Sequence, residues 1–369
     1  MPTRTTTARR RNPALMALGW FWAVVLVMGL GGAGVLQVLG PPAANHVAAS
    51  PPAPVSPPAM PPPAVAAAAA PPPASSSPAP VAPAPVSPAP PSGPRAPGSA
   101  IPAGDVALLE PSGLADGSML PRIGPDGRAP MRVYAGGAPA KDARPRVALL
   151  LGDFGMREAD GEEALRMLPP AISFVVSPYA VRPGELIVQA RASGHELWLA
   201  LPMEPRGFPL DDPGNRAMLT GAPPAQNEAQ LRWVLSRLQG YAGTTGALGS
   251  QRGERFAASG QMADVLAELG RRGLMYVDPR VDGQLPALPA GTPAPPRRAV
   301  DLVIDEPGVR TEIEAKLARL EQIARDRGSA LGLASAPVPV TVERLAAWVS
   351  LLNERGVVLV PASALLLTP

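Results

Sequence analysis

The sequence predicts an α/β domain over residues 106–369, in which amphipathic helices cover a parallel β-sheet. One repeated pattern leads to this fold class. Apolar runs of strand length alternate with helix-length amphipathic segments, and this alternation repeats seven or eight times along the chain. Repeated β-α units of this kind form parallel sheets, either as a barrel or as a doubly wound sheet, and periodicity alone does not choose between the two.

The expected strands are short and rich in branched apolar residues. In order along the chain they are Val147–Leu151, Ile172–Val176, Leu197–Leu201, Thr244–Leu248, Leu274–Asp278, Val300–Ile304, Ala330–Ala334 and Val357–Val360. The clearest helix lies between the sixth and seventh strands. There, Thr311 and Glu314 have the spacing of a capping box, and Gly328 provides the stop.

The first hundred residues have a different composition from the rest of the chain. An uncharged apolar run, Ala14–Leu39, is long enough to cross a bilayer as a helix, and Arg9, Arg10 and Arg11 precede it. By the positive-inside rule, residues 1–13 form a cytoplasmic tail and the rest of the chain lies outside the cytoplasm. We therefore expect a single-pass protein of the bacterial inner membrane with a periplasmic domain, and a cleavable signal peptide is the competing interpretation.

Residues 40–105 are expected to be a disordered Pro/Ala-rich linker. Many of the 52 prolines of the chain fall here, and such a segment cannot bury enough apolar surface to fold. It predicts a stalk between the membrane and the domain.

Composition also excludes several classes of function. The chain has no cysteine, which rules out disulfides, cysteine-ligated metals and a thiol nucleophile. Its net charge is +3, but four arginines lie in the N-terminal tail, so the remaining chain is nearly neutral. A nearly neutral domain lacks the cationic face that nucleic acids require, so no nucleic-acid partner is expected.

Three carboxylates are selected as candidate site residues by their position. In parallel α/β folds the functional site lies at the carboxyl ends of the strands. Asp153 and Glu204 lie two and three residues after a predicted strand, and Asp278 is the last residue of another. Paired carboxylates of this kind also leave glycosidic cleavage open as an alternative chemistry, with Asp153 acting together with Glu204 or Asp278.

The same segments resemble the divergent polysaccharide deacetylase family, which is related to the NodB-type carbohydrate deacetylases. The similarity extends over most of residues 108–366. The matching stretches are Leu149–Gly155, Gly194-His195-Glu196, Leu201-Pro202-Met203-Glu204-Pro205, Asp212-Pro213-Gly214, Gly249-Ser250, Arg272-Gly273-Leu274 and Leu359–Ser363. The resemblance implies a seven-stranded β/α barrel-like domain that acts on cell-envelope polysaccharide or peptidoglycan fragments.

The sequence departs from the family pattern at the positions that carry chemistry. The pattern has two adjacent aspartates, implied to be a general base and a metal ligand, where this chain has Gly152 and Asp153. It has histidines where this chain has Ala200, Ala247 and Ser335. Asp153 and Glu204 are then the remaining candidate metal ligands, and His195 is expected to be structural.

These departures predict a catalytically impaired member that binds a glycan and needs no cofactor. Trp198, Tyr179 and Phe154 are the expected sugar-stacking residues. An active deacetylase with a rearranged ligand set, holding Zn²⁺ or another divalent metal, is the first alternative. A scaffold that binds a protein partner in the envelope is the second.

Overall fold

The structure is a computed structural model that describes residues 95–139, 142–181, 183–281 and 283–367. The predicted cytoplasmic tail, the predicted membrane helix and residues 40–94 of the predicted linker lie outside the described residues. Among the residues that the structure does describe, no helix is both long and apolar enough to cross a membrane.

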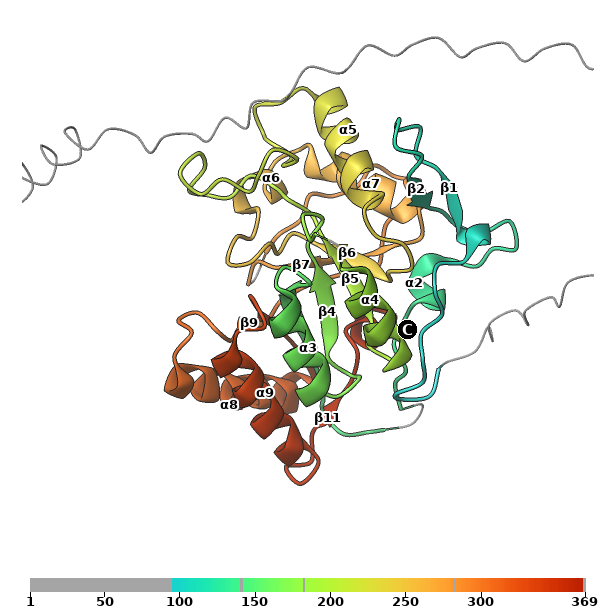
Figure 1. Cartoon of the computed structure of the whole chain (residues 1–369). Coiled ribbons are helices and arrows are strands. Elements are labelled where there is room, and N and C mark those ends of the chain that lie inside the picture. Colours follow the sequence, from blue (N-terminus) through green and yellow to red (C-terminus); the bar gives the residue numbers. More distant parts are fainter. Residues whose placement is uncertain (1–94, 140–141, 182, 282, 368–369) are drawn as a thin grey trace, which may run out of the picture. The chain divides into compact units, whose positions relative to one another are not determined.

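A parallel sheet of nine strands forms the centre of the described part of the chain (Figure 1). Its strands run in the order β8-β7-β6-β5-β4-β3-β10-β9, and β11 pairs with β3. The bounds are β3 Arg146–Phe154, β4 Ser173–Val176, β5 Leu197–Ala200, β6 Gly243–Thr245, β7 Met275–Asp278, β8 Arg297–Ala299, β9 Leu302–Val303, β10 Ser329–Ala334 and β11 Val358–Leu359.

The sheet curls because β8 and β9, which are close together in the sequence, lie at opposite ends of the strand order. Only Val300 and Asp301 separate β8, which pairs with β7, from β9, which pairs with β10. The Val300 N–H donates to the Asp278 carbonyl at 2.9 Å, and the Asp301 N–H donates to the Leu331 carbonyl at 2.9 Å. The predicted α/β fold with a curled parallel sheet is therefore confirmed, but the sheet has nine strands in place of the expected seven. The expected sixth strand contains β9, and β8 precedes it as an additional strand.

Alternate residues of β3, β4, β5, β7 and β10 enter two separate apolar cores, as the two-residue period of a strand requires. Val147, Leu149 and Leu151 of β3 pack with residues of the helices. Ala148 and Leu150 instead join a smaller core built from β3, β4, β5, β7 and β10, to which none of the helices α3 to α9 contributes a buried residue. This second core fills the inside of the curled sheet.

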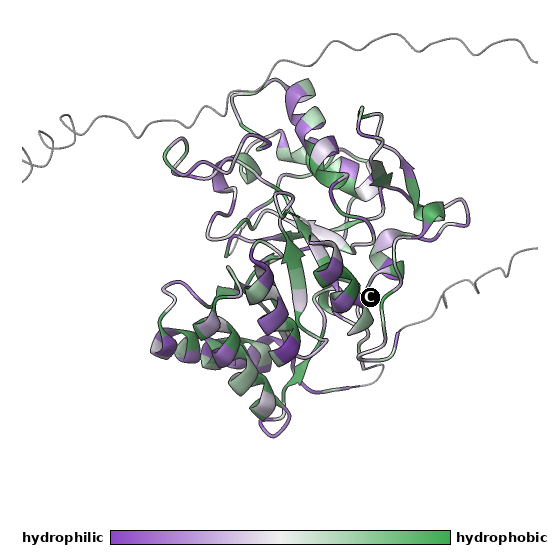
Figure 2. Ribbon diagram, viewed as in Figure 1, coloured by the Kyte–Doolittle hydropathy of each residue, from purple (hydrophilic) through white to green (hydrophobic). Residues whose placement is uncertain are grey.

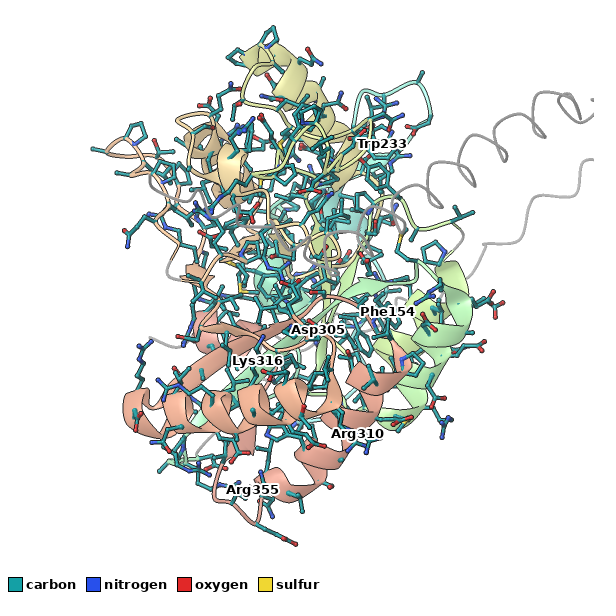
Figure 3. All side chains as sticks on the ribbon, turned by 90° about the vertical axis from the view of Figure 1, so that its left-hand side faces the viewer. Phe154, Trp233, Asp305, Arg310, Lys316 and Arg355 are labelled. Atoms are coloured by element: carbon teal, nitrogen blue, oxygen red, sulfur yellow. The ribbon has the colours of Figure 1, made fainter. Side chains whose placement is uncertain are left out.

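The longer helices cover the outer face of the sheet. α8 and α9 pack together next to α3, while α5, α6 and α7 form a second group (Figure 1). β4 is mainly hydrophobic, whereas the outer helices carry many hydrophilic residues (Figure 2). In Figure 3, the labelled residues Arg310 and Lys316 mark α8. The bounds are α2 Pro130–Val133, α3 Glu158–Met167, α4 Gly184–Ala192, α5 Pro224–Leu235, α6 Glu254–Ala257, α7 Met262–Arg271, α8 Arg310–Arg327, α9 Pro339–Leu352 and α10 Ser363–Leu366.

The helix α8 follows the predicted pattern except at its start. Ile313, Leu317, Leu320 and Ile323 are all buried, and Gly328 ends the helix in a left-handed conformation with φ 81°. The predicted capping box is wrong, because the helix begins at Arg310 and its N-cap residue, Val309, has no capping side chain. Glu314 pairs with Arg344 of α9 at 2.9 Å instead.

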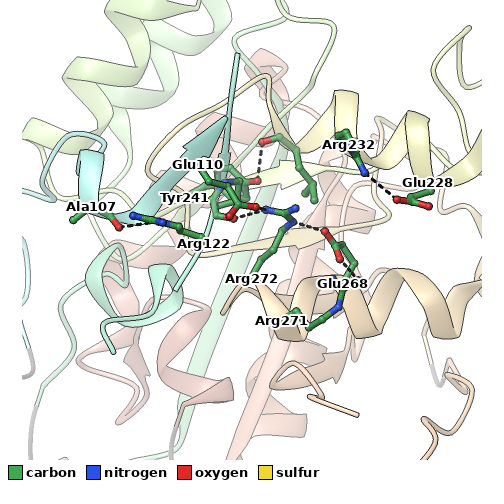
Figure 4. Close-up of polar contacts among 11 residues, drawn as sticks. Ala107, Glu110, Arg122, Glu228, Arg232, Tyr241, Glu268, Arg271 and Arg272 are labelled. Atoms are coloured by element: carbon green, nitrogen blue, oxygen red, sulfur yellow. Dashed lines mark hydrogen bonds and ion pairs between the residues drawn. The ribbon is translucent and has the colours of Figure 1, made fainter. Parts of the chain in front are cut away.

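A small hairpin precedes the sheet and is tied to α7 by one arginine. After the 3₁₀ turn Val106–Leu108, strands β1 (Leu109–Pro111) and β2 (Met119–Pro121) pair antiparallel. Arg272 lies just after α7 and forms ion pairs with Glu268 at 2.5 Å and with Glu110 of β1 at 2.9 Å (Figure 4). The same guanidinium donates to the Pro121 carbonyl at 2.7 Å.

The last residues of the predicted linker belong to the folded domain. Ile101 is 4% exposed and lies in the core inside the sheet. Arg95 donates to the carbonyls of Ala135 at 2.9 Å and Val133 at 3.3 Å, and Asp105 pairs with Arg128 at 2.8 Å. The placement of residues 95–105 in a disordered linker is therefore corrected, because these residues pack against the domain and bury an apolar side chain.

Candidate functional site

Glycine or alanine stands at three inward-facing positions at or just beyond the carboxyl ends of β3, β5 and β6. Ala200 and Ala247 are 2% exposed and belong to the core inside the sheet. Gly152 lies two residues beyond Leu150, so it is on the same inward face of β3. These are three of the positions where the family pattern has a base or a histidine, and here they hold only hydrogen or methyl groups.

The position of Gly152 also leaves no room for a side chain. A Cβ atom added to this residue would lie 2.4 Å from the carbonyl oxygen of Ser335 and 3.2 Å from that of Ala334. Both oxygens belong to the main chain at the end of β10, which pairs with β3 along its length. A carboxylate therefore cannot be placed here unless the backbone of β10 moves.

Of the three candidate carboxylates, Asp153 is the one that forms no salt bridge within the described residues. It has φ 50°, which is unique among the non-glycine residues that the structure describes. Its Oδ1 accepts the Gly249 N–H at 3.0 Å, a bond that joins the ends of β3 and β6. Burial raises the pKa of Asp153, and the Gly249 N–H and Arg157 offset only part of this effect.

Glu204 is buried, and both of its carboxylate oxygens are already hydrogen-bonded. Oε2 accepts from the backbone and the hydroxyl of Thr220 at 2.5 and 2.6 Å, and Oε1 pairs with Arg255 at 2.8 Å. Burial raises the pKa of Glu204, but the hydrogen bonds from Thr220 and Arg255 outweigh it and leave the pKa below its ordinary value. Glu204 thus connects the loop after β5 to α6.

Asp278 is fully buried and is neutralised by a near neighbour. Its carboxylate accepts three bonds from the Arg280 guanidinium, two from Nε at 2.9 and 3.2 Å and one from Nη2 at 2.6 Å. It also accepts the Arg280 N–H at 3.1 Å. Val277 belongs to the core inside the sheet, so the next residue, Asp278, lies on the opposite face. The structure does not bring Asp278 together with Asp153.

A second polar group at the same sheet edge was missed by the sequence analysis. Arg252 is 6% exposed and donates to the Gly249 carbonyl at 3.3 Å. Arg252 also pairs with Glu306. The Oε1 atom of Glu306 in turn accepts the Ser335 hydroxyl at 2.8 Å. Asp305 accepts the Ser335 N–H at 2.8 Å. Asp305 directly follows the sixth predicted strand, so the rule that selected Asp278 also applies to it, whereas nothing in the sequence pattern marks Arg252.

These donors do not fit a metal site. Zn²⁺ is held by about three protein ligands. In the described ranges, no three side chains of His, Asp or Glu are grouped so that they could hold a metal ion. Glu204, Asp278 and Glu306 are bound to arginines, which leaves Asp153 and Asp305. Both of these carboxylates already accept a main-chain N–H, from Gly249 and from Ser335 respectively.

His195 and two of the three expected sugar-stacking residues lie in the core. His195 is 1% exposed, its Nδ1 is 2.9 Å from the Ile172 carbonyl, and its ring stacks on Phe174 with centroids 4.3 Å apart. Burial lowers the pKa of His195 to about 4. Phe154 also stacks on Phe174, and Trp198 is fully buried. Of the three expected sugar-stacking residues, Tyr179 alone is therefore partly exposed.

The comparisons with known proteins agree with this fold. The chain is 28% identical over 229 residues to the uncharacterized protein YibQ of Escherichia coli (strain K12), covering 61% of this chain and 68% of YibQ. It is also similar to the crystal structure of the uncharacterized protein ATU2773 from Agrobacterium tumefaciens C58. That match has 30% identity and a TM-score of 0.61, and it covers 67% of this chain and 99% of that one. The model of the family described as divergent polysaccharide deacetylase matches residues 149–366. The chain therefore belongs to the divergent polysaccharide deacetylase family.

Proposed function

We propose that this protein is a non-hydrolytic member of its family that binds glycan in the metabolism of cell-envelope polysaccharide. The observation that carries the proposal is the inward face at the strand ends, where Gly152, Ala200 and Ala247 stand at the positions of a base and metal ligands. The nearest main chain occupies the space of a Gly152 side chain.

The chemistry of amide hydrolysis supports this proposal. Removal of an acetyl group requires a polarised carbonyl, an activated water and a group that accepts its proton. Asp153 is a single carboxylate, and its Oδ1 accepts the Gly249 N–H. Glu204 and Asp278 are held by Arg255 and Arg280, so neither is available as a partner in the reaction.

The envelope location is proposed from the sequence alone. Ala14–Leu39 is long enough to span a bilayer and follows Arg9–Arg11, so the domain is placed on the periplasmic side of the inner membrane. A reporter enzyme that works only outside the cytoplasm, fused after Pro369, is expected to be active. Activity of a reporter that works only in the cytoplasm, fused at the same position, would overturn the topology.

Binding and hydrolysis of one glycan, measured together, test the function. Purified full-length protein is incubated with the tetrasaccharide of N-acetylglucosamine and with Zn²⁺, Mn²⁺ or Co²⁺, and both acetate release and the dissociation constant are determined. The proposal expects saturable binding without acetate release. Acetate release would support the alternative of an active enzyme with a rearranged ligand set, whereas absence of binding to any envelope saccharide would favour the protein scaffold.

A further inference from the structure

Two arginines lie against one tryptophan on α5. The guanidinium carbon of Arg216 and that of Arg237 are each 4.8 Å from the centre of the Trp233 ring. Trp233 is half-buried and lies in the upper group of helices, well away from Arg355 (Figure 3). A guanidinium held flat on an aromatic ring keeps its edge oriented for planar acceptors such as carboxylates.

The two arginines differ in how their charges are compensated. Arg237 pairs with Asp116 at 2.6 Å and also donates to the Ser236 hydroxyl at 2.7 Å. Arg216, by contrast, has no carboxylate of the described residues within ion-pairing distance. Its guanidinium lies over the Trp233 ring. Arg216 is half-buried, so its positive charge is partly removed from water without an anionic partner.

Tyr179 adds a hydrogen-bond donor beside this charge. Its ring centre is 6.2 Å from that of Trp233, and its hydroxyl oxygen accepts the Arg216 N–H at 3.2 Å. Because the oxygen accepts this bond, the hydroxyl proton remains available to another acceptor. Burial raises the pKa of Tyr179, so the hydroxyl keeps its proton at neutral pH.

These groups lie at the sheet edge where α/β folds bind ligands. Tyr179 follows β4 by three residues, and Arg216 lies in the loop after β5, the strand next to β4. Asp153 is the second-last residue of β3, the neighbour of β4 on its other side. The carboxyl ends of neighbouring parallel strands share one edge, so the segments that carry Arg216 and Tyr179 leave the sheet at the same edge as the candidate site.

We propose that Arg216 and Tyr179 recognise the carboxylate of an acidic saccharide, an inference that rests on the proposed glycan-binding function. One unpaired guanidinium matches one carboxylate charge and one hydroxyl donates to the same group. A phosphate dianion would call for a second free cation, and Arg237 is already paired with Asp116. The predicted ligand is therefore a carboxylate-bearing sugar, such as a muramic acid residue, in preference to a neutral one.

The test compares an acidic disaccharide with its neutral ester. Purified full-length protein is titrated calorimetrically with N-acetylglucosaminyl-N-acetylmuramic acid and with the methyl ester of its carboxyl group. We expect the acid to bind roughly ten- to a hundredfold more tightly, the range of a charge-assisted hydrogen bond. Arg216→Gln is expected to remove this preference, and Tyr179→Phe to reduce it.

Arg237→Gln serves as the matched control, because it removes a guanidinium from the same ring and should leave the preference intact. Equal binding of acid and ester by the wild type, or a preference that survives Arg216→Gln, would overturn the carboxylate site while leaving glycan binding in place. Binding of neither sugar would refute the glycan-binding function as well. Full competition by inorganic phosphate would assign the site to phosphate and contradict the proposal.

Discussion

Gly152 shows how a single residue determines what the site can do. The carbonyl of Ser335 would be 2.4 Å from a Cβ at this position, and a main-chain atom cannot rotate away as a side chain would. We therefore expect Gly152→Ala to lower the free energy of unfolding by about 2–3 kcal/mol, the usual effect of overpacking. Gly152→Asp should destabilise further, so it cannot restore a base simply by adding a carboxylate.

Gly184→Ala is the control for this measurement. Gly184 is the first residue of α4, and nothing lies within 4 Å of an added Cβ. Denaturant unfolding of both variants should show a loss for Gly152→Ala alone. Equal stability of the two variants would mean that β10 yields readily at Ser335, and the site could then accept a base.

Glu196 is a second residue on which several segments depend. Its Oε1 accepts from Ser173 at 3.0 Å, from Trp198 at 2.5 Å and from the Ser363 N–H at 3.1 Å, while Oε2 accepts the Gly136 N–H at 2.9 Å. Glu196→Gln replaces one accepting oxygen by an amide donor, so at least one buried donor loses its partner. We expect a loss of about 2–3 kcal/mol in the free energy of unfolding.

The exposed Glu228 provides the comparison, since its one ion-pair partner among the described residues is Arg232 on the surface of α5. Glu228→Gln should change stability by less than about 0.5 kcal/mol. A similar small effect for Glu196→Gln would show that the four bonds to its carboxylate contribute little.

At the scale of elements, an aromatic stack joins β3 and β4 to the segment before β5 and makes the fold sensitive to acid. Phe154 stacks on Phe174, with ring centres 4.3 Å apart, and Phe174 stacks on His195. Burial lowers the pKa of His195 from its ordinary 6.5 to about 4, because the folded protein favours the neutral ring. This contribution to stability is complete above pH 6.5 and is lost as the pH falls toward 4.

The expected loss between these pH values is about 3 kcal/mol, from 1.36 kcal/mol per pKa unit. Other groups also titrate in this range, so the measurement compares unfolding of the wild type and of His195→Phe at pH 7 and pH 4.5. The variant should lose less stability on acidification than the wild type. An equal loss in both would remove His195 as the cause.

The elements that depend on local pattern were predictable from the sequence, and those that depend on distant pairing were not. All eight predicted strands overlap observed ones, because each buried strand is a short apolar run bounded by turn residues. The predicted strand Val300–Ile304 contains only β9, and the preceding strand β8 was not predicted. These two short strands are separate because they pair with different neighbours, β10 and β7, which no local pattern encodes.

The candidate site divides in the same way. The strand-end rule located Asp153, Glu204 and Asp278, but it could not show what each carboxylate contacts. Glu204 is held by Arg255, 51 residues away in the chain, and Arg252 reaches Glu306 across 54 residues. Only the folded chain reveals that such charges are already paired.

At the scale of the whole molecule, the folded domain begins earlier than its composition indicates. Ile101 is buried, and Arg95 and Asp105 bond to residues beyond 125. A protein that starts at Arg95 should therefore unfold at the same denaturant concentration as one that keeps the whole linker. One that starts at Val106 should lose at least about 3 kcal/mol, since it removes a buried isoleucine and several hydrogen bonds.

Equal stability of the two shortened proteins would contradict this boundary. Ile101→Ala in the full-length chain gives an independent check, with an expected loss of about 2–4 kcal/mol for a buried isoleucine. Ala103→Ser, at an exposed position in the same segment, should have little effect.

The central claim is that the strand-end site of this family member has lost the groups that bind metal and activate water. The most direct measurement is the metal-to-protein ratio of the full-length protein after it is equilibrated with excess Zn²⁺ and freed of unbound metal on a desalting column. We expect a ratio far below one, unchanged in Asp153→Ala. One tightly held Zn²⁺ per chain, lost in Asp153→Ala, would contradict it and would identify an active site with a rearranged set of ligands.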